Sequence, residues 1–262
     1  MKYNLFPKIL SSIILAAGIA IGLANTSQAQ ISYTPVGSLY TQDFNIMGPT
    51  GTTTPTGWFV GSGPGSAVTG TTVTPDTGTN TTPDHYNYGV AGVNPVTDRA
   101  LGSKNDSGQQ LDTEVHFINN TGVALTQFTI SYTGEEWRNG GSNNTNFLNL
   151  QFSLTGTAGS WISLGAAFNF ASPINSLSAT ALDGNVAANR VTNIGGTFTS
   201  GTPVLNGGTF FFRFADPDEN GKDDGLAIDD FSFRAVPEPS VYMLLGVGLL
   251  LCGQRYLRRK SA

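Results

Sequence analysis

The sequence is poor in cysteine and histidine, and each scarcity excludes a class of chemistry. Cys252 is the only cysteine of the 262 residues and lies in an apolar segment near the C-terminus. The chain before it can therefore hold no internal disulfide, thiol nucleophile or cysteine-ligated metal. His85 and His116 are the only histidines, and they have neither the spacing of a zinc site nor a G-x-S-x-G motif nearby. We interpret both as incidental.

Basic residues are also rare. Between Gln30 and Ala235 there are seven Lys or Arg and seventeen Asp or Glu, which gives a formal net charge of −10. Nucleic acid is not expected as a partner, because binding to phosphates requires basic side chains. An acidic surface instead favours solubility and attracts cations.

Helical periodicity is nearly absent from residues 30–235. Apolar and polar residues alternate in stretches such as 128–132 (FTISY) and 148–154 (LNLQFSL), and clusters of Gly, Asn and Asp separate these stretches. The pattern predicts an all-β domain, an antiparallel β-sandwich or jelly roll. Residues 48–83, rich in Thr, Gly and Pro, are expected to form a long loop region, or alternatively an O-glycosylated or matrix-contacting tract.

The N-terminus has the features of an export signal. Lys2 and Lys8 precede an apolar run from Ile9 to Ala24, and the small residues Ser27 and Ala29 follow it. We predict a signal peptide over residues 1–29, cut after Ala29 by signal peptidase.

The C-terminus carries a second apolar segment. Val241 to Gly253 would extend about 20 Å as a helix, which is marginal against a hydrocarbon core of about 30 Å unless flanking residues join it. The basic residues after it favour a cytoplasmic end: Arg255, Arg258, Arg259 and Lys260. We predict a short transmembrane helix over 241–253, with a buried core helix as the alternative.

The motif before this segment is Val236-Pro237-Glu238-Pro239-Ser240. Together with the apolar and basic residues it resembles the PEP-CTERM sorting signal of bacteria that make extracellular polysaccharide, over residues 236–262. The resemblance implies recognition by an exosortase, a membrane cysteine protease that removes the tail and releases or transfers the protein to the cell surface. Such a tail is an address rather than part of the mature domain.

The middle of the chain has a resemblance of its own. The stretches YTQDFN, PTGW, RALGS, NNTG, ISYTGEEWR, LDGNVAANR and DPDENGKDDGLAIDDFSF are similar to an extracellular bacterial β-sandwich family. That resemblance implies a jelly-roll-like adhesive or binding module, and it implies no reaction.

The densest polar stretch, 216–224, suggests calcium. Oxygen-bearing residues at its positions one, three and five, with Gly221 at six, match the front half of a calcium loop, but position twelve is Ala227, so an EF-hand is excluded. A looser Ca²⁺ site remains as one interpretation, and a hairpin loop of turn-forming residues is the other. The candidate ligands are Asp216, Asp218, Asn220, Asp223 and Asp224.

Asp229 and Asp230 stand where the alternation changes phase. Leu226 and Ile228 follow one phase while Phe231 and Phe233 follow the other, so we expect a β-bulge here. A carboxylate turned inward by the bulge would need a cation or several N–H donors. We expect a structural clasp with an arginine, or alternatively a metal or ligand role; the candidate arginines are Arg138 and Arg213.

Glu135 and Glu136 raise the question of glycoside hydrolysis. Adjacent strand residues point to opposite faces, so we expect one of the two to be buried and the other exposed, a poor arrangement for an acid and base on one sugar. A partner from elsewhere, such as Asp112 or Glu114, stays open.

Aromatic residues could bind sugars if they are exposed. For Trp58 and Trp161 we favour core packing, and Trp137 is a further candidate for either role. Tyr86 and Tyr88 lie among predicted loop residues and are the better ligand-binding candidates.

These observations favour an exported, non-enzymatic protein of the cell surface or polysaccharide matrix. The alternatives are a calcium-supported carbohydrate-binding module, which an exposed aromatic strip would favour, and a glycan-active enzyme, which two carboxyl groups in a deep cleft would favour.

Overall fold

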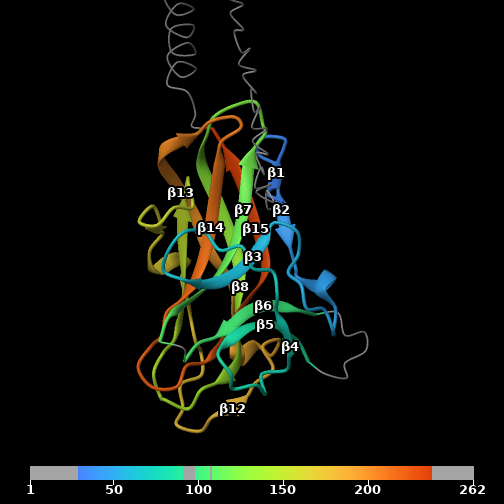
Figure 1. Cartoon of the computed structure of the whole chain (residues 1–262), viewed down its shortest axis with the longest axis vertical. Helices are drawn as coiled ribbons and strands as arrows, with labels where there is room; N and C mark the ends of the chain where they lie inside the picture. Colours follow the sequence, from blue (N-terminus) through green and yellow to red (C-terminus); the bar gives the residue numbers. More distant parts are fainter. Residues whose placement is uncertain (1–28, 91–97, 107, 238–262) are drawn as a thin grey trace, which may run out of the picture.

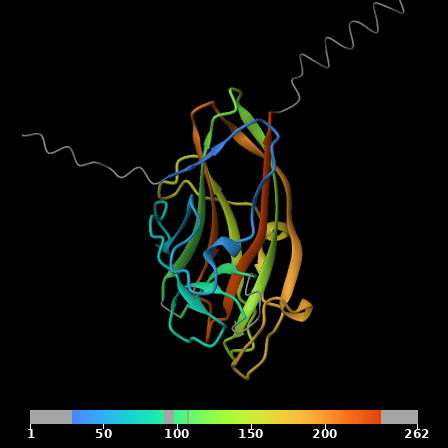
Figure 2. The same cartoon turned by 90° about the vertical axis from the view of Figure 1, so that its right-hand side faces the viewer.

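The computed structural model describes residues 29–90, 98–106 and 108–237. Two curled β-sheets stack face to face, which confirms the predicted all-β sandwich (Figure 1, Figure 2). The predicted signal peptide except Ala29, and the predicted tail except Val236 and Pro237, lie outside the described residues. Within the described ranges, no helix is both long and apolar enough to span a membrane.

The first sheet has the strand order β1-β7-β14-β9-β10, with β3 beside β7 and β11 beside β9. Its strands are β1 (Ile31–Tyr33), β3 (Trp58–Gly63), β7 (Gln110–Asn119), β9 (Phe147–Ser153), β10 (Ile162–Ser163), β11 (Phe170–Ala171) and β14 (Thr209–Asp216). All of its pairs are antiparallel except β1 with β7.

The second sheet has the strand order β12-β8-β15-β6-β5-β4, with β13 beside β8 and β2 beside β15. Its strands are β2 (Tyr40–Gln42), β4 (Thr74–Asp76), β5 (Asp84–Tyr88), β6 (Ala100–Lys104), β8 (Leu125–Asn139), β12 (Thr180–Ala181), β13 (Arg190–Val204) and β15 (Gly225–Val236). Only β4 and β5 pair in parallel. Three short 3₁₀-helices complete the described part, η1 (Asn45–Met47), η2 (Ala166–Phe168) and η3 (Ala187–Asn189).

Aromatic residues fill the space between the sheets. Phe210, Phe212 and Phe214 alternate on β14 and all point inward. Phe210 stacks on Phe117 of β7 with ring centroids 5.0 Å apart, and Phe233 of the second sheet packs 4.9 Å from Phe117. Burial of each such ring contributes about 1.5 to 3 kcal/mol, so this core is the main source of stability in the described domain.

The predicted bulge in β15 is present. The register with β8 shifts between Asp229 and Ser232, and Asp230 takes a left-handed backbone conformation with φ of 49°. The shift returns Phe231 and Phe233 to the same buried face as the residues that precede the bulge. It also turns Asp229 into a buried position and leaves Asp230 exposed.

The region 48–83 is less loop-like than its composition suggests. It contains β3, which pairs with β7, and β4, which pairs with β5. Threonine, glycine and proline therefore form turns around two short strands, because cross-strand pairing overrides a weak local preference.

The two ends of the described chain meet at one pole of the sandwich. The Tyr33 hydroxyl lies 2.8 Å from the Ala235 amide nitrogen that donates to it. β15 begins at the opposite pole, after the β14–β15 loop, and its 12 residues span about 40 Å at about 3.3 Å per residue (Figure 1).

Candidate functional site

Acidic side chains gather in three places, and each is built by different strands. The loop-end cluster lies at the pole away from the chain ends, and we define it as Lys104, Asp106, Glu136, Asp216, Glu219, Asp223 and Asp224. The Arg213 clasp lies on the outer face of the first sheet, and the outer-face pair, Glu135 and Asp229, lies on the outer face of the second.

The loop-end cluster begins where β14 ends. Ser103 Oγ donates to Asp216 Oδ2 at 2.6 Å, and Asn105 Nδ2 donates to the Asp216 backbone oxygen at 2.8 Å. The loop then returns through Asp223, whose amide donates to Asp106 Oδ1, and Asp224, whose Oδ1 accepts from the Gly140 amide at 2.7 Å. Three connections between strands thus meet at one place.

Several carboxylate oxygens of this cluster are buried without a hydrogen-bond partner. Asp216, Asp223 and Asp224 are 1%, 1% and 2% exposed. The unpartnered atoms are Asp216 Oδ1, both oxygens of Asp223, and Asp224 Oδ2, together with Glu136 Oε1 and Glu219 Oε2. A buried carboxylate oxygen without a donor is costly, so these atoms need an explanation.

Positive charge is scarce in the loop-end cluster. Lys104 Nζ is buried and contacts Asp106 Oδ2 at 2.5 Å, whereas Lys222 is 72% exposed and lies 3.9 Å from the same carboxylate. Burial, reinforced by the neighbouring carboxylates, raises the pKa of Asp223 to about 7 and that of Glu219 to about 8.

Of the predicted calcium ligands, the structure buries Asp216, Asp223 and Asp224 at this pole and leaves Asp218 and Asn220 exposed. Glu219, Asp106 and Glu136 were not predicted; only Glu219 could have been taken from the acidic run itself. Among the described residues, no group of three or more His, Cys, Asp or Glu has the geometry to hold a metal ion. Calcium binding here stays a prediction.

The Arg213 clasp joins two strands and a loop. Arg213 Nε donates to Glu114 Oε1 at 2.7 Å, and Asp112 Oδ2 lies 3.4 Å from the same nitrogen. The guanidinium also donates to the backbone oxygens of Gly65 and Ser66, both at 3.2 Å. The clasp therefore ties the 64–68 loop to the outer face of the first sheet.

Glu114 is satisfied on every side. It also accepts hydrogen bonds from the Val68 amide and from His116 Nε2 at 2.8 Å. The His116 ring packs between Phe59 and Phe211 with centroid distances of 4.3 and 4.7 Å. His116 is thus a structural part of the clasp rather than incidental.

The expected partners of the arginines differ from those in the structure. Arg213 pairs with Glu114 and Asp112, and Arg138 donates to the Gly78 backbone oxygen at 3.0 Å. Asp229 forms no ion pair within the described ranges; its Oδ1 accepts from the Asp230 amide at 2.7 Å. The clasp between β15 and an arginine was therefore a wrong prediction, because β14 and β7 place Arg213 on the other sheet.

Glu135 and Asp229 form the outer-face pair on the neighbouring strands β8 and β15. Glu135 Oε2 accepts from Trp137 Nε1 at 2.9 Å, while its Oε1 is buried without a partner. Burial raises the pKa of Glu135 to about 7; burial and the Glu135 charge raise that of Asp229 to about 9. Both shifts favour the protonated form of these carboxyl groups.

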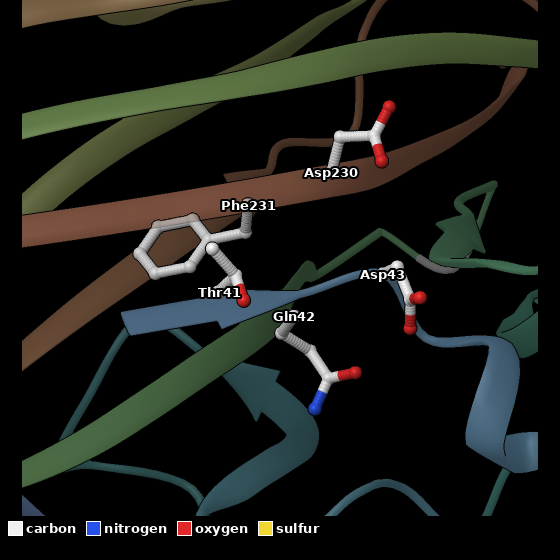
Figure 3. Close-up of a pocket in the computed structure, with 5 residues that line it drawn as sticks. All are labelled: Thr41, Gln42, Asp43, Asp230 and Phe231. Atoms are coloured by element: carbon white, nitrogen blue, oxygen red, sulfur yellow. The ribbon is translucent and has the colours of Figure 1, made fainter. Parts of the chain in front are cut away.

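A pocket of about 200 Å³ opens near this pair between β2 and β15. Its lining residues are Thr41, Gln42, Asp43, Asp230 and Phe231. Figure 3 shows the carboxylate of Asp43, directly after β2, and that of Asp230 on β15, both beside the same open space. Burial and these two charges raise the pKa of the nearby Asp98 carboxyl.

Glu135 and Glu136 do not form a catalytic pair. Glu136 Oε2 accepts from the Ile174 amide at 2.7 Å, and Glu136 lies near Asp224 in the loop-end cluster. The two glutamates point to opposite faces, as predicted, but both are buried, so the expectation that one is exposed was wrong. Asp112 and Glu114 are held by Arg213 on the other sheet and partner neither of them.

The tyrosines predicted to bind sugar are buried. Tyr86 and Tyr88 are each 1% exposed, and Tyr88 stacks on Trp137 with centroids 5.7 Å apart and planes 5° from parallel. The Tyr86 hydroxyl donates to the Thr82 backbone oxygen at 2.6 Å. Gly184 packs so closely that an added Cβ would lie 2.4 Å from Trp137 Nε1. Neither tyrosine offers a free face, so this prediction was wrong.

The other two tryptophans differ from each other. Trp58 is fully buried in the core, as predicted. Trp161 is half-buried, and the Arg213 guanidinium carbon lies 3.7 Å from its ring centroid. Trp161 therefore packs on the clasp and not in the core, so the core packing favoured for it was wrong.

No family model matches the chain, and no curated protein matches it in sequence. Among solved structures, it is similar to the CBM22-1 xylan-binding domain of Xyn10C from Paenibacillus barcinonensis, with 10% identity, a TM-score of 0.39, and 78% of this chain and 99% of that chain covered.

It is also similar to the K3 cleaved adhesin domain of Lys-gingipain from Porphyromonas gingivalis w83, with 15% identity, a TM-score of 0.41, and coverage of 74% and 97%. A third similar structure is TmCBM61 in complex with β-1,4-galactotriose, with 12% identity, a TM-score of 0.31, and coverage of 74% and 94%. Likenesses at this level assign neither a family nor a ligand to the chain.

Proposed function

We propose that the chain is an exported, non-enzymatic protein of the cell surface or the exopolysaccharide matrix. Residues 1–29 direct export, and residues 236–262 form the tail that an exosortase recognises. The observation that carries the proposal is that β15, the last strand of the described residues, ends where the sorting motif begins, since Val236 is both the final residue of β15 and the first of the motif. A processing enzyme acts on a segment that is not held in a sheet, and of the two described motif residues, Val236 and Pro237, only Val236 belongs to β15.

The arrangement of the two poles supports a display role. The tail follows the pole at which Tyr33 and Ala235 are bonded, and the loop-end cluster lies at the other. A domain held at a surface by its C-terminus presents the acidic pole outward. An acidic outer pole attracts cations and repels anionic polymers.

The contacts that the buried carboxylates make agree with a non-enzymatic role. Glu114 and Asp112 are paired with Arg213, and Glu135 and Glu136 face opposite sides of β8. Hydrolysis of a glycosidic bond needs two carboxyl groups across one cleft.

One observation favours carbohydrate binding as a second candidate. The pocket between β2 and β15 is lined by the hydroxyl, amide and carboxylate groups of Thr41, Gln42, Asp43 and Asp230, which are suitable hydrogen-bond partners for sugar hydroxyls. Glycan-array binding that disappears in Asp43→Ala would support this candidate, and binding unchanged in that variant would remove the pocket from consideration.

The sorting proposal is tested by changing the motif alone. The full chain and a Pro237→Ala/Glu238→Ala variant are produced in a bacterium that has an exosortase, and protease added to intact cells reports surface exposure. Pro83→Ala, in an exposed turn, is the matched control. We expect the wild type and the control to reach the surface and the double variant to remain in the membrane fraction. Equal surface exposure of all three would contradict sorting by this motif.

A further inference from the structure

We propose that the loop-end cluster binds Ca²⁺, with Asp216, Asp223 and Asp224 as carboxylate ligands. The proposal is independent of how the protein is sorted. It assigns a metal site by the burial of these side chains rather than by their order in the sequence.

The loop-end cluster contains buried carboxylate oxygens without a hydrogen-bond partner. Four carboxylate oxygens belong to three side chains that are 2% exposed or less, and Asp223 contributes two of them. Carboxylates are rarely left buried without donors, because transfer of a charged group from water is costly unless it is paired or bound to a metal. These four oxygens are therefore acceptors without a donor, although other oxygens of the same side chains accept hydrogen bonds from Ser103 and Gly140.

Carboxylates outnumber cations in the loop-end cluster. The cluster contains six carboxylates, and Lys104 is its only buried cation within the described ranges. Lys104 is already engaged with Asp106 Oδ2 and with the Asn105 backbone oxygen at 3.1 Å. Lys222 lies at the exposed rim. A divalent cation would offset two further negative charges without an additional side chain.

The ligand chemistry selects the ion. The groups that face the cluster are carboxylates, the Asn146 amide and backbone oxygens, and no Cys or His of the described residues belongs to it. Oxygen ligands of irregular geometry suit Ca²⁺, whereas Mg²⁺ demands a regular octahedron and Zn²⁺ prefers nitrogen and sulfur. A Cβ added to Gly140 would lie within 2.5 Å of the backbone oxygens of Lys222 and Asp223. The chain at Gly140 therefore packs directly against these two carbonyl groups.

The site is not a preformed cage. No three carboxylates of the described residues already surround one point. Binding therefore requires the carboxylates to move closer to one point, and Asp223 has the fewest hydrogen bonds to break, because both of its oxygens are buried without a partner of good geometry. Asp218 and Asn220, which the loop pattern favours, are exposed and are not assigned as ligands.

The test measures binding and stability on the full-length protein in mild detergent after treatment with EDTA. Calorimetric titration with CaCl₂ reports binding directly, and Tm is measured in EDTA, in Ca²⁺ and in Mg²⁺. The variants are Asp223→Asn and Asp216→Asn. The matched controls are Asp218→Asn, exposed on the same loop, and Glu135→Gln, a buried carboxylate outside the cluster.

We expect wild type and both controls to bind Ca²⁺ with Kd about 10⁻⁴ to 10⁻³ M, as extracellular modules do. Saturating Ca²⁺ should raise Tm by about 3 to 6 °C, and Mg²⁺ should raise it less. Asp223→Asn should lose the Ca²⁺ shift and, in EDTA, melt above wild type because a buried charge is gone. If it does not fold, Asp216→Asn decides the same point.

Two results would overturn the proposal. Wild-type protein that shows no calorimetric binding and no Ca²⁺-specific shift in Tm would exclude the site, and the buried carboxylates would then be neutralised by protons. Binding that is undiminished in the variants that fold, or that is lost equally in Asp218→Asn, would place the ion elsewhere.

Discussion

Replacement of Arg213 by methionine tests the main electrostatic feature of the fold. Arg213→Met keeps a long apolar side chain but removes the charge that faces Glu114 and Asp112, both of which are fully buried. Loss of one partner from a buried ion pair costs about 3 to 5 kcal/mol, because the remaining charge stays buried without compensation. Loss of the cation–π contact with Trp161 adds about 0.5 to 2 kcal/mol.

The assay is urea unfolding followed by tryptophan fluorescence, with Tm as a second measure. For a domain of this size, 3 to 5 kcal/mol corresponds to a drop in Tm of about 6 to 20 °C. The matched control is Arg234→Met, an exposed arginine on β15, which should change the free energy of unfolding by less than about 0.5 kcal/mol.

A double-mutant cycle separates the pair from simple loss of packing. Glu114→Gln alone should destabilise the protein, and the double variant should be more stable than the sum of the two single changes predicts, by about 0.5 to 3 kcal/mol. An Arg213→Met variant as stable as Arg234→Met, or additive effects in the cycle, would refute the clasp as a stabilising network.

Other predictions concern the second sheet and the core. Burial raises the pKa of Glu135 in the folded state to about 7, against an ordinary value of 4.5, so its contribution to stability is complete below pH 4.5 and is lost as pH rises through 7. Glu135→Gln should therefore remove part of the decline in Tm between pH 4.5 and 8. An unchanged dependence of Tm on pH in this variant would contradict the argument. Asp230 has φ of 49°, so Asp230→Gly should be nearly neutral while Asp230→Val loses about 1 to 2 kcal/mol in urea unfolding; equal stability of the two would show that the bulge relaxes. Trp58→Ala should cost about 3 to 5 kcal/mol, measured in the same way, because the ring is fully buried against Phe44 and Phe231; a loss below 1 kcal/mol would mean that the core repacks.

The local features of the fold were predictable from the sequence. Alternation identified the strands around 128–132 and 148–154, since residues on one face of a half-buried strand are apolar. The change of phase between Ile228 and Phe231 predicted the bulge, because only an extra residue can return both to the core.

Long-range pairing was not predictable in the same way. Arg213 and Glu114 are 99 residues apart, and the sequence does not say which strands are neighbours. A signal existed nonetheless, since Asp112, Glu114 and His116 alternate on one face of β7, and a polar face on a buried strand needs a partner.

The candidate site was predicted only where it is local. The acidic run gave Asp216, Asp223 and Asp224, but not Asp106 or Glu136, which β6–β7 and β8 bring to the same pole. Tyr86 and Tyr88 were assigned to the surface because their neighbours are polar, whereas in the structure Trp137 stacks on Tyr88, Gly184 packs on Trp137, and the Tyr86 hydroxyl donates to the Thr82 backbone oxygen. Coverage by distant segments is a tertiary property, and local composition does not show it.

The central claim is that the mature protein is the β-sandwich alone, delivered outside the cell. Intact-mass spectrometry of the protein recovered from the surface or matrix of exosortase-containing cells tests this most directly. The account predicts a chain that begins at Gln30 and lacks the basic residues 255–260. A mass that includes both Met1 and those basic residues, from protein found in the cytosol, would contradict it.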